Sequence, residues 1–312
     1  MIHRQAAQLS AAFAHQVLSI SSPQGRFREG AQLLDGSQLV ATRAHGKHLF
    51  LGFCAPSERL GEVEPDGGVV SNGRVALGDG DAPDGGVETD GGTALEEESG
   101  WDRAAHWVHI HLGLYGKWRW HDFDEAPADP VGQVRLRMAG SFQVADLSGP
   151  NRCEILDADS AQAIIDRLGP DPLDPQPGDK RRFVDAVRAR SRAVGELVMD
   201  QSVVAGPGNI YRAECLFHVG ISPFRPGNRV SRRRLSQLWD DLVENLERGS
   251  REGLIVTIAD EDRPHPPVEG DEEAQRFYVY HRSGRACLRC GAHIGEQPMA
   301  GRRLFWCPGC QR

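Results

Sequence analysis

Long apolar runs and a cysteine-rich framework are both missing from this sequence. No eighteen consecutive apolar residues occur, and no basic segment precedes a short apolar one. A membrane-spanning helix and a secretory signal are therefore not expected. The seven cysteines in 312 residues are too few for a disulfide scaffold, and four of them lie near the C-terminus. This usage is typical of a reducing compartment, so we expect a cytoplasmic protein.

A net positive charge, which is common in nucleic-acid-binding proteins, is also absent, because the formal net charge is −8. The charge is unevenly spread along the chain. Residues 55–106 contain 13 Asp and Glu against 3 Arg, a net charge of −10, which leaves the remainder at +2. Residues 179–234 carry 12 Lys and Arg against 5 Asp and Glu, and residues 280–312 carry 6 Arg against 1 Glu. One acidic segment therefore masks two basic ones, and nucleic-acid binding is not excluded.

The acidic segment, residues 55–103, interrupts the first half of the chain. Eleven glycines and no aromatic residue occur between positions 61 and 100. Such a composition cannot bury enough apolar surface to offset the chain entropy, so the segment is predicted to be a disordered insertion within one domain. We expect it to be a solvated loop without a specific role.

The remainder of the first half is predicted to be mainly β. The first seventeen residues form one apolar stripe at helical spacing. Residues 39–53 then show strand-like patterning, and residues 107–120 are typical of two strands around a glycine-containing loop. Residues 133–147 alternate around Ala139 and Gly140, which predicts a hairpin.

Helical periodicity replaces the strand pattern from Ser160 onward. Residues 161–168 are predicted to form one helix and residues 180–204 a single long one. After a Gly-Pro-Gly break, Asn209 is predicted to be the N-cap of a short helix ending near Gly220. Ser231 is predicted to cap a further helix.

The strongest motif is a pair of Cys-x2-Cys knuckles separated by sixteen residues: Cys287, Cys290, Cys307 and Cys310. Two such knuckles can place four thiolates tetrahedrally around one zinc ion, with no ligand position left open. We therefore expect one structural Zn2+ and a β-hairpin between the knuckles. Free or disulfide-bonded cysteines and an iron–sulfur site are the alternatives. The remaining cysteines are expected to be small core residues.

Two further features can bind phosphate. Arg302 and Arg303 fall at the expected tip of the metal-stapled hairpin, where they either contact phosphate or are solvated surface arginines. The turn at residues 206–208 precedes a new helix at Asn209, whose free N–H groups suit an anion. A helical corner within a core is the alternative for this turn, and neither choice is settled by local physics.

Seven sequence strings together resemble the formamidopyrimidine-DNA glycosylase and endonuclease VIII family. Residues 205–211 are similar to its helix–two-turn–helix signature, and residues 278–287 with 305–311 are similar to its zinc-finger hairpin. Further strings resemble an actinobacterial endonuclease VIII branch: residues 22–27, 45–50, 109–116 and 167–173. They follow the family order over nearly the whole chain, outside the 55–103 insertion.

The resemblance implies an α+β protein that acts on damaged double-stranded DNA. An N-terminal antiparallel β-sandwich with flanking helices (1–150), a helix–two-turn–helix domain (157–262) and a four-cysteine zinc-finger β-hairpin (277–312) are expected. The implied activity is that of a base-excision-repair DNA glycosylase and AP lyase. It would remove oxidised bases, with pyrimidines as the leading class, and nick the strand by β,δ-elimination. A monomer at the bacterial nucleoid is expected.

The resemblance also implies roles for individual residues. Lys47 matches a lysine beside the lesion phosphate that donates a proton, and Arg302 matches the hairpin arginine that grips the lesion phosphates. Leu114 and Tyr115 fall where the family inserts a wedge into the gap left by the flipped base. Two further matches are DNA-backbone contacts, namely Arg167 and Asn209. Gly113 stands where the enterobacterial enzyme has a Gln.

The chain departs from the family pattern at its first residues. The family begins Met-Pro-Glu-Gly-His, in which the proline amine is the nucleophile and the glutamate a general acid, whereas this chain begins Met1-Ile2-His3-Arg4. Efficient lyase activity of these 312 residues is therefore not expected, and a start upstream is the preferred explanation. The alternative functions are a catalytically impaired binder of damaged DNA or abasic sites and an RNA- or ribosome-associated zinc protein.

Overall fold

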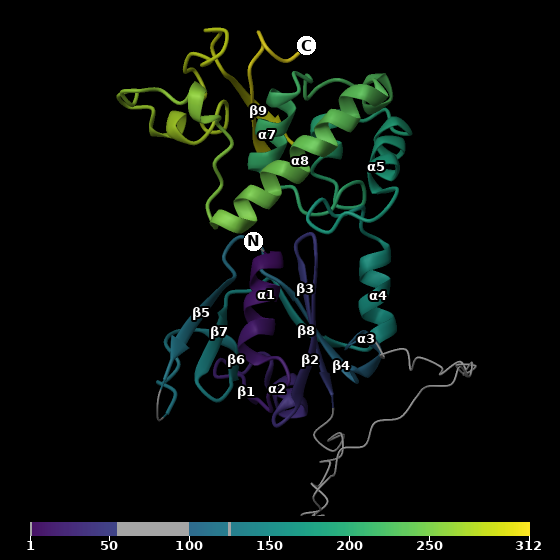
Figure 1. Ribbon diagram of the computed structural model, residues 1–312, viewed down its shortest axis with the longest axis vertical. Coiled ribbons are helices and arrows are strands. Elements are labelled where there is room, and N and C mark those ends of the chain that lie inside the picture. The colour runs from purple at the N-terminus through teal and green to yellow at the C-terminus, as the bar shows by residue number, and fades with distance from the viewer. Residues whose placement is uncertain (1, 55–99, 124–125) are drawn as a thin grey trace, which may run out of the picture.

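The protein consists of two lobes that meet near the N-terminal helix (Figure 1). The computed structural model describes residues 2–54, 100–123 and 126–312. The lower lobe in Figure 1 is a β-sandwich with helices on its outside, and the upper lobe is helical with a C-terminal hairpin. The predicted α+β class is therefore confirmed. No helix within the described ranges is both long and apolar enough to cross a membrane.

Two four-stranded antiparallel sheets form the sandwich of the N-terminal lobe. One sheet has the order β2 (Gln38–His45), β3 (His48–Cys54), β4 (His106–His111) and β8 (Arg152–Leu156). The other has the order β1 (Ser19–Ser21), β6 (Val134–Ala139), β7 (Gln143–Ser148) and β5 (Lys117–Asp122). The predicted strands in 39–53 and 107–120 and the hairpin about Ala139–Gly140 are all present.

Alternation along the strands places one set of apolar side chains between the two sheets. Leu49, Leu51, Val108 and Ile110 are fully buried there, together with Leu136 and Leu147 of the facing sheet. Helix α1 (Ile2–Phe13) adds its buried stripe to this core, and α2 (Arg28–Leu34) adds Ala31 and Leu34. The predicted N-terminal helix is correct, although it ends at Phe13 and not at residue 17.

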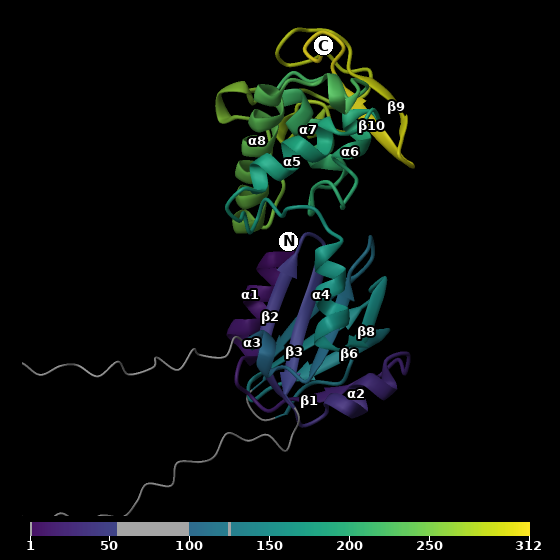
Figure 2. The ribbon, with the colours of Figure 1, turned by 90° about the vertical axis from the view of Figure 1, so that its right-hand side faces the viewer.

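The outer face of the β2-β3-β4-β8 sheet is covered by α4 (Ala158–Asp166), which lies across it in Figure 2. Next to it, residues 100–103 form the short helix α3 (Gly100–Arg103), and the Trp101 ring packs 4.0 Å from the Trp107 ring. These four residues fall within the predicted disordered insertion, and that prediction is wrong for them because Trp101 gives them an apolar anchor. The remainder of the insertion, 55–99, lies outside the described residues.

The C-terminal lobe contains α5 (Asp179–Arg188), α6 (Val194–Leu197), α7 (Asn209–His218) and α8 (Arg232–Glu252). The prediction of a single helix over 180–204 is wrong, because the helix is interrupted between α5 and α6. There the Val194 amide donates to the Arg225 carbonyl at 2.9 Å, and Ala193 forms a β-bridge with Pro226. This tertiary pairing overrides local helix propensity. Both helices still face one core, in which the apolar residues of 180–204 at helical spacing are buried: Phe183, Val184, Val187, Val194, Leu197 and Val198.

The α8 cap is as expected, since the Ser231 hydroxyl accepts a hydrogen bond from the Arg234 amide. Short 3-10 turns occur at Gly227–Arg229, Asp260–Asp262 and Glu272–Gln275. The chain ends in the predicted hairpin of β9 (Gly295–Met299) and β10 (Arg302–Trp306), which extends downward on one side of the helical lobe in Figure 2.

Candidate functional site

The end of the sandwich nearest the helical lobe gathers three loops. Register pairs His48 with His111, Lys117 with Ser148 and His111 with Arg152. The β2–β3 turn, the β4–β5 loop and the start of β8 therefore share one edge of the lobe. Four of the predicted site residues lie in or near these loops or beside the junction with the second lobe: Lys47, Leu114, Tyr115 and Arg167.

The β2–β3 turn is held against the second lobe by backbone contacts. The Gly46 amide donates to the Asp171 carboxylate at 2.6 Å, and a His45 ring nitrogen lies 2.9 Å from the Gly169 carbonyl oxygen. Gly46 has a φ of +58°, and a Cβ here would lie 2.8 Å from both the Ala205 Cβ and the Gly206 nitrogen. Only glycine permits this approach. The turn therefore presents Lys47 directly to the residues that precede α7.

Lys47 reaches across the junction between the lobes. Its Nζ donates to the Pro207 carbonyl at 2.7 Å, two residues before Asn209. Burial, together with the charge of Arg302, lowers the pKa of the Lys47 ammonium to about 8. Lys47 is therefore partly neutral near physiological pH, and an anion bound beside it would favour its charged form.

The C-terminal hairpin is attached to the start of α7. The Asn209 side-chain amide donates to the Arg303 carbonyl at 2.9 Å, while its oxygen accepts from the Arg212 guanidinium. The predicted N-cap role of Asn209 is wrong, because Gly208 occupies the cap position and Asn209 is the first helical residue. Its side chain instead positions the loop that carries Arg302.

Arg212 is the residue that sequence reasoning missed at this contact. It is fully buried and donates to the carbonyls of Met299 at 3.0 Å and Arg303 at 3.3 Å. Among the described residues it has no carboxylate partner. Burial and the nearby Arg302 lower the pKa of its guanidinium to about 10. A buried cation without a counter-ion favours an anion next to it. No pattern in the sequence distinguishes it from a surface arginine on a helix.

The two hairpin arginines differ in their contacts. Arg303 forms an ion pair with Glu296, with nitrogen–oxygen distances of 2.5 and 3.0 Å, and its guanidinium also lies over the Phe305 ring. Arg302 has no ion-pair partner within the part of the chain that the structure describes. Arg302 is therefore the arginine of this pair whose charge is not neutralised by an ion pair in the protein.

The predicted wedge residues project from the β4–β5 loop. Leu114 is 72% exposed and Tyr115 is 84% exposed, which is unusual for large apolar side chains. The loop is tight enough to require glycine at position 116, because a Cβ there would lie 2.3 Å from the Leu112 carbonyl oxygen. Arg167 is exposed at the end of α4 and donates to the Ala163 carbonyl at 2.9 Å. The structure therefore presents Leu114 and Tyr115 to solvent from the β4–β5 loop and Arg167 from the end of α4.

The four C-terminal cysteines converge on one point. Their sulfur atoms all lie within 4.8 Å of one another, with Cys287 Sγ 3.8 Å from Cys310 Sγ and Cys290 Sγ 3.4 Å from Cys307 Sγ. Four thiolates around a zinc ion at about 2.3 Å would be separated by roughly 3.8 Å. The cluster can hold a metal, and its sulfur spacing fits zinc.

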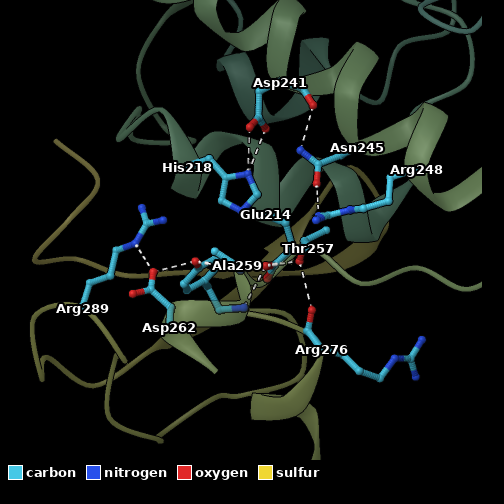
Figure 3. A network of polar contacts seen from close by, with 11 residues as sticks. Glu214, His218, Asp241, Asn245, Arg248, Thr257, Ala259, Asp262, Arg276 and Arg289 are labelled. Carbon is cyan, nitrogen blue, oxygen red and sulfur yellow. Dashed lines mark hydrogen bonds and ion pairs between the residues drawn. The ribbon is translucent and has the colours of Figure 1, made fainter. Parts of the chain in front are cut away.

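A buried carboxylate, that of Glu214, joins the C-terminal four-cysteine module (residues 277–312) to α7 (Figure 3). Glu214 is fully buried and accepts a hydrogen bond from the Thr257 hydroxyl at 2.6 Å. It also accepts from three consecutive backbone amides, those of residues 278–280, at 2.7–2.8 Å. In the same view, His218 Nδ1 lies 2.9 and 3.0 Å from the two Asp241 oxygens. The module is therefore anchored to the helix that begins at Asn209.

Curated relatives match this chain over most of its length. The endonuclease 8 1 of Mycobacterium tuberculosis (strain ATCC 25618 / H37Rv) is 35% identical over 313 residues, covering 99% of this chain and 97% of the relative. The formamidopyrimidine-DNA glycosylase of Roseiflexus sp. (strain RS-1) is 32% identical over 225 residues, covering 68% and 81%. The family model described as the formamidopyrimidine-DNA glycosylase H2TH domain matches residues 168–259.

Solved structures show the same fold. The formamidopyrimidine-DNA glycosylase of Lactococcus lactis, bound non-covalently to DNA containing an AP site, superposes with a TM-score of 0.67 at 20% identity, covering 100% of this chain and 98% of that one. The corresponding protein of Thermus thermophilus has a TM-score of 0.66 at 21% identity, with coverages of 99% and 97%.

Proposed function

This chain belongs to the family of formamidopyrimidine-DNA glycosylases and endonuclease 8, and we propose that it is a DNA glycosylase and AP lyase that removes oxidised bases. Oxidised pyrimidines are the proposed substrate class, and strand nicking by β,δ-elimination is the proposed outcome. The observation that carries the proposal is that Lys47 of one lobe donates to the Pro207 carbonyl of the other and lies close enough to Arg302 of the hairpin for its pKa to be lowered by that charge. The proposed site of action is the bacterial nucleoid.

The roles proposed for individual residues come from the family resemblance, and the position and exposure of several of them support it. Lys47 and Arg302 supply positive charge for the phosphates around the lesion, and Lys47 is also the proposed proton donor for elimination. The N–H groups at the start of α7 add backbone donors beside them. Leu114 and Tyr115 are proposed to fill the gap left by the flipped base, because both are large and exposed. Backbone phosphate contacts are proposed for Arg167 and Asn209.

The four cysteines are proposed to hold one structural zinc ion. All four positions of a tetrahedral site are then filled by protein, so the ion supplies order to the hairpin and no open coordination position. The hairpin carries Arg302 at the first residue of β10. The metal therefore positions this arginine without contacting DNA.

The test of the proposed function is covalent trapping with borohydride. An amine that attacks C1′ forms a Schiff base with the sugar, and reduction makes that bond permanent. Incubation of a duplex containing an oxidised pyrimidine with a protein in which Met-Pro-Glu-Gly-His and a small residue replace Met1 should give a trapped complex and a nicked strand. Tight binding to abasic duplexes without any trapped complex would instead support the second candidate, a non-enzymatic binder of damaged DNA.

Arg302→Ala is expected to weaken binding to an abasic-site duplex by about 1–3 kcal/mol, because it removes a charge-assisted phosphate contact. The slope of log affinity against log salt should become shallower by about 1. Fluorescence anisotropy at several salt concentrations measures both quantities. Arg303→Ala is the matched control, because Arg303 is already paired with Glu296 and should change the slope little. Equal slopes for Arg302→Ala and the wild type would contradict the assigned contact.

Binding to abasic DNA is expected to weaken as the pH rises through about 8, the pKa of Lys47. Below this pH the ammonium is charged and attracts phosphate, and above it the neutral amine does not. Because bound phosphate raises the pKa of Lys47, the transition should lie higher in the complex than in the free protein. Lys47→Arg keeps its charge throughout this range and should give a flatter profile. Identical profiles for the two proteins would show that Lys47 does not contact phosphate.

A further inference from the structure

Lys47 sits in a turn whose other residues are all held in place. Gly46 is hydrogen-bonded to Asp171 and packed against Ala205, while His45 contacts the Gly169 carbonyl. The remaining neighbour, His48, is held by a chain of side chains that leads away from the junction. The turn is thus fixed at three of its four residues, and only the Lys47 side chain is left to reach across.

The hydrogen-bonded side chains that hold His48 lie across the outer face of three adjacent strands, β3, β4 and β8. His48 Nδ1 lies 2.8 Å from His109 Nε2, and His109 Nδ1 lies 2.9 Å from the Glu154 carboxylate. The rings of His48 and His109 are stacked, with centroids 5.1 Å apart. Strand register places His109 directly opposite Glu154 on β8. His48 is opposite His111, so His109, two residues along β4, is its diagonal neighbour on the same face.

The direction of these hydrogen bonds follows from the carboxylate at the end of the chain. Although burial opposes it, hydrogen bonds from His109 and Arg152 hold the pKa of the Glu154 carboxyl below its usual range, so it only accepts. His109 must then donate from Nδ1, which leaves its Nε2 as an acceptor for the Nδ1–H of His48. Burial lowers the pKa of both imidazoles, that of His48 to about 3, so each stays neutral and has one defined tautomer.

If His109 served only to fill space, an apolar residue would do so with a smaller desolvation penalty. The side chain of His109 is 2% exposed and stacks on Phe50, which belongs to the apolar cluster under α4. A buried polar ring has to be hydrogen-bonded at both nitrogens to avoid a desolvation penalty, and here both are. Such a fully connected network gives a single arrangement of its members.

We propose that Glu154 and His109 are positioning residues for Lys47: they hold His48, and through it the β2–β3 turn, so that the Lys47 ammonium meets the Pro207 carbonyl beside Arg302. The proposal rests on the function assigned above to Lys47. It adds a specific network, made of side chains on β3, β4 and β8, that fixes the position of the Lys47 ammonium from the side of the turn away from the second lobe. Glu154 and His109 themselves need not touch DNA.

Titration of Lys47 tests this directly, because the chain contains three lysines: Lys47, Lys117 and Lys180. With lysine labelled by 13C, NMR resolves each titration, and the other two lysines serve as internal references. Glu154→Gln and His109→Phe should loosen the turn and raise the pKa of Lys47 from about 8 toward the ordinary lysine value of about 10.4. With the Met-Pro-Glu-Gly-His start added to each protein, single-turnover nicking of an abasic duplex should be about 10-fold to 100-fold slower in these variants.

His106→Gln is the control, because His106 lies at the far end of the same strand β4. A Lys47 titration that stays at the wild-type pKa in Glu154→Gln would overturn the proposal, as would an equal shift in His106→Gln. If His109→Phe does not fold, Glu154→Gln decides, since its partly exposed side chain tolerates replacement. Failure of the wild-type protein with the added Met-Pro-Glu-Gly-His start to trap or nick any DNA would contradict the proposed function, while the lysine titration would still decide the positioning role.

Discussion

A version of the protein in which Met-Pro-Glu-Gly-His and then a small residue replace Met1, ahead of Ile2, is expected to nick damaged DNA far faster than the 312-residue chain. In the 312-residue sequence the first proline is Pro23. The family's secondary-amine nucleophile and the glutamate next to it are therefore not among these residues. A general acid alone contributes about 10²–10⁴-fold, and a positioned nucleophile adds to this. Trapping with borohydride on a duplex with an oxidised pyrimidine measures the difference.

Two matched extensions identify the cause of any gain. Replacing the added proline with alanine should remove most of it, and replacing the added glutamate with glutamine should remove the share that general acid catalysis supplies. Equal trapping by the extended and the 312-residue proteins would contradict the prediction. It would indicate that another amine attacks the sugar, and Lys47, with a pKa of about 8, is the first to examine.

Cys307→Ser is expected to release the metal and unfold the C-terminal hairpin. Cys307 is fully buried, and its sulfur lies 3.4 Å from that of Cys290. Structural zinc contributes about 10–16 kcal/mol to the folding of small modules, and three ligands cannot close the site. Because β10 begins with Arg302, abasic-site binding should fall with the metal content.

The measurement is elemental analysis of the purified protein together with circular dichroism and DNA binding. Cys54→Ser is the control, because Cys54 is also buried but belongs to the β-sandwich, and this variant should retain its zinc. Wild-type protein that contains no zinc, or a Cys307→Ser variant that binds abasic DNA as tightly as wild type, would contradict the assignment.

Local sequence patterns predicted most of the fold because the apolar periodicity of each segment matches its burial. The stripe of α1 and the alternation in β6 and β7 both face the sandwich core. The prediction failed where a distant segment decided the backbone. The chain between Arg188 and Val194 leaves the helix because Arg225 and Pro226 pair with it, and no pattern within 180–204 reports that pairing.

The site was predictable only where a residue belongs to a motif. The four cysteines carry their own spacing, and Lys47 and Arg302 came from a family resemblance and not from local physics. Arg212 and Glu214 lie in α7, where every residue from Tyr211 to Phe217 is buried. Only the folded structure shows that Arg212 holds the hairpin at Met299 and Arg303 and that Glu214 holds the backbone of residues 278–280. The roles of His109 and Glu154 depend on strand register, which alternation alone does not determine.

The central claim is that damaged DNA binds where Lys47 and Arg302 meet, and competition binding tests it most directly. A labelled abasic-site duplex is displaced by unlabelled abasic duplex, by undamaged duplex and by structured RNA, using the wild type and the Lys47→Ala/Arg302→Ala double variant. We predict that abasic duplex competes best against the wild type and that the double variant loses this preference. Equal competition by all three nucleic acids, stronger competition by RNA, or an unchanged preference in the double variant would contradict the claim.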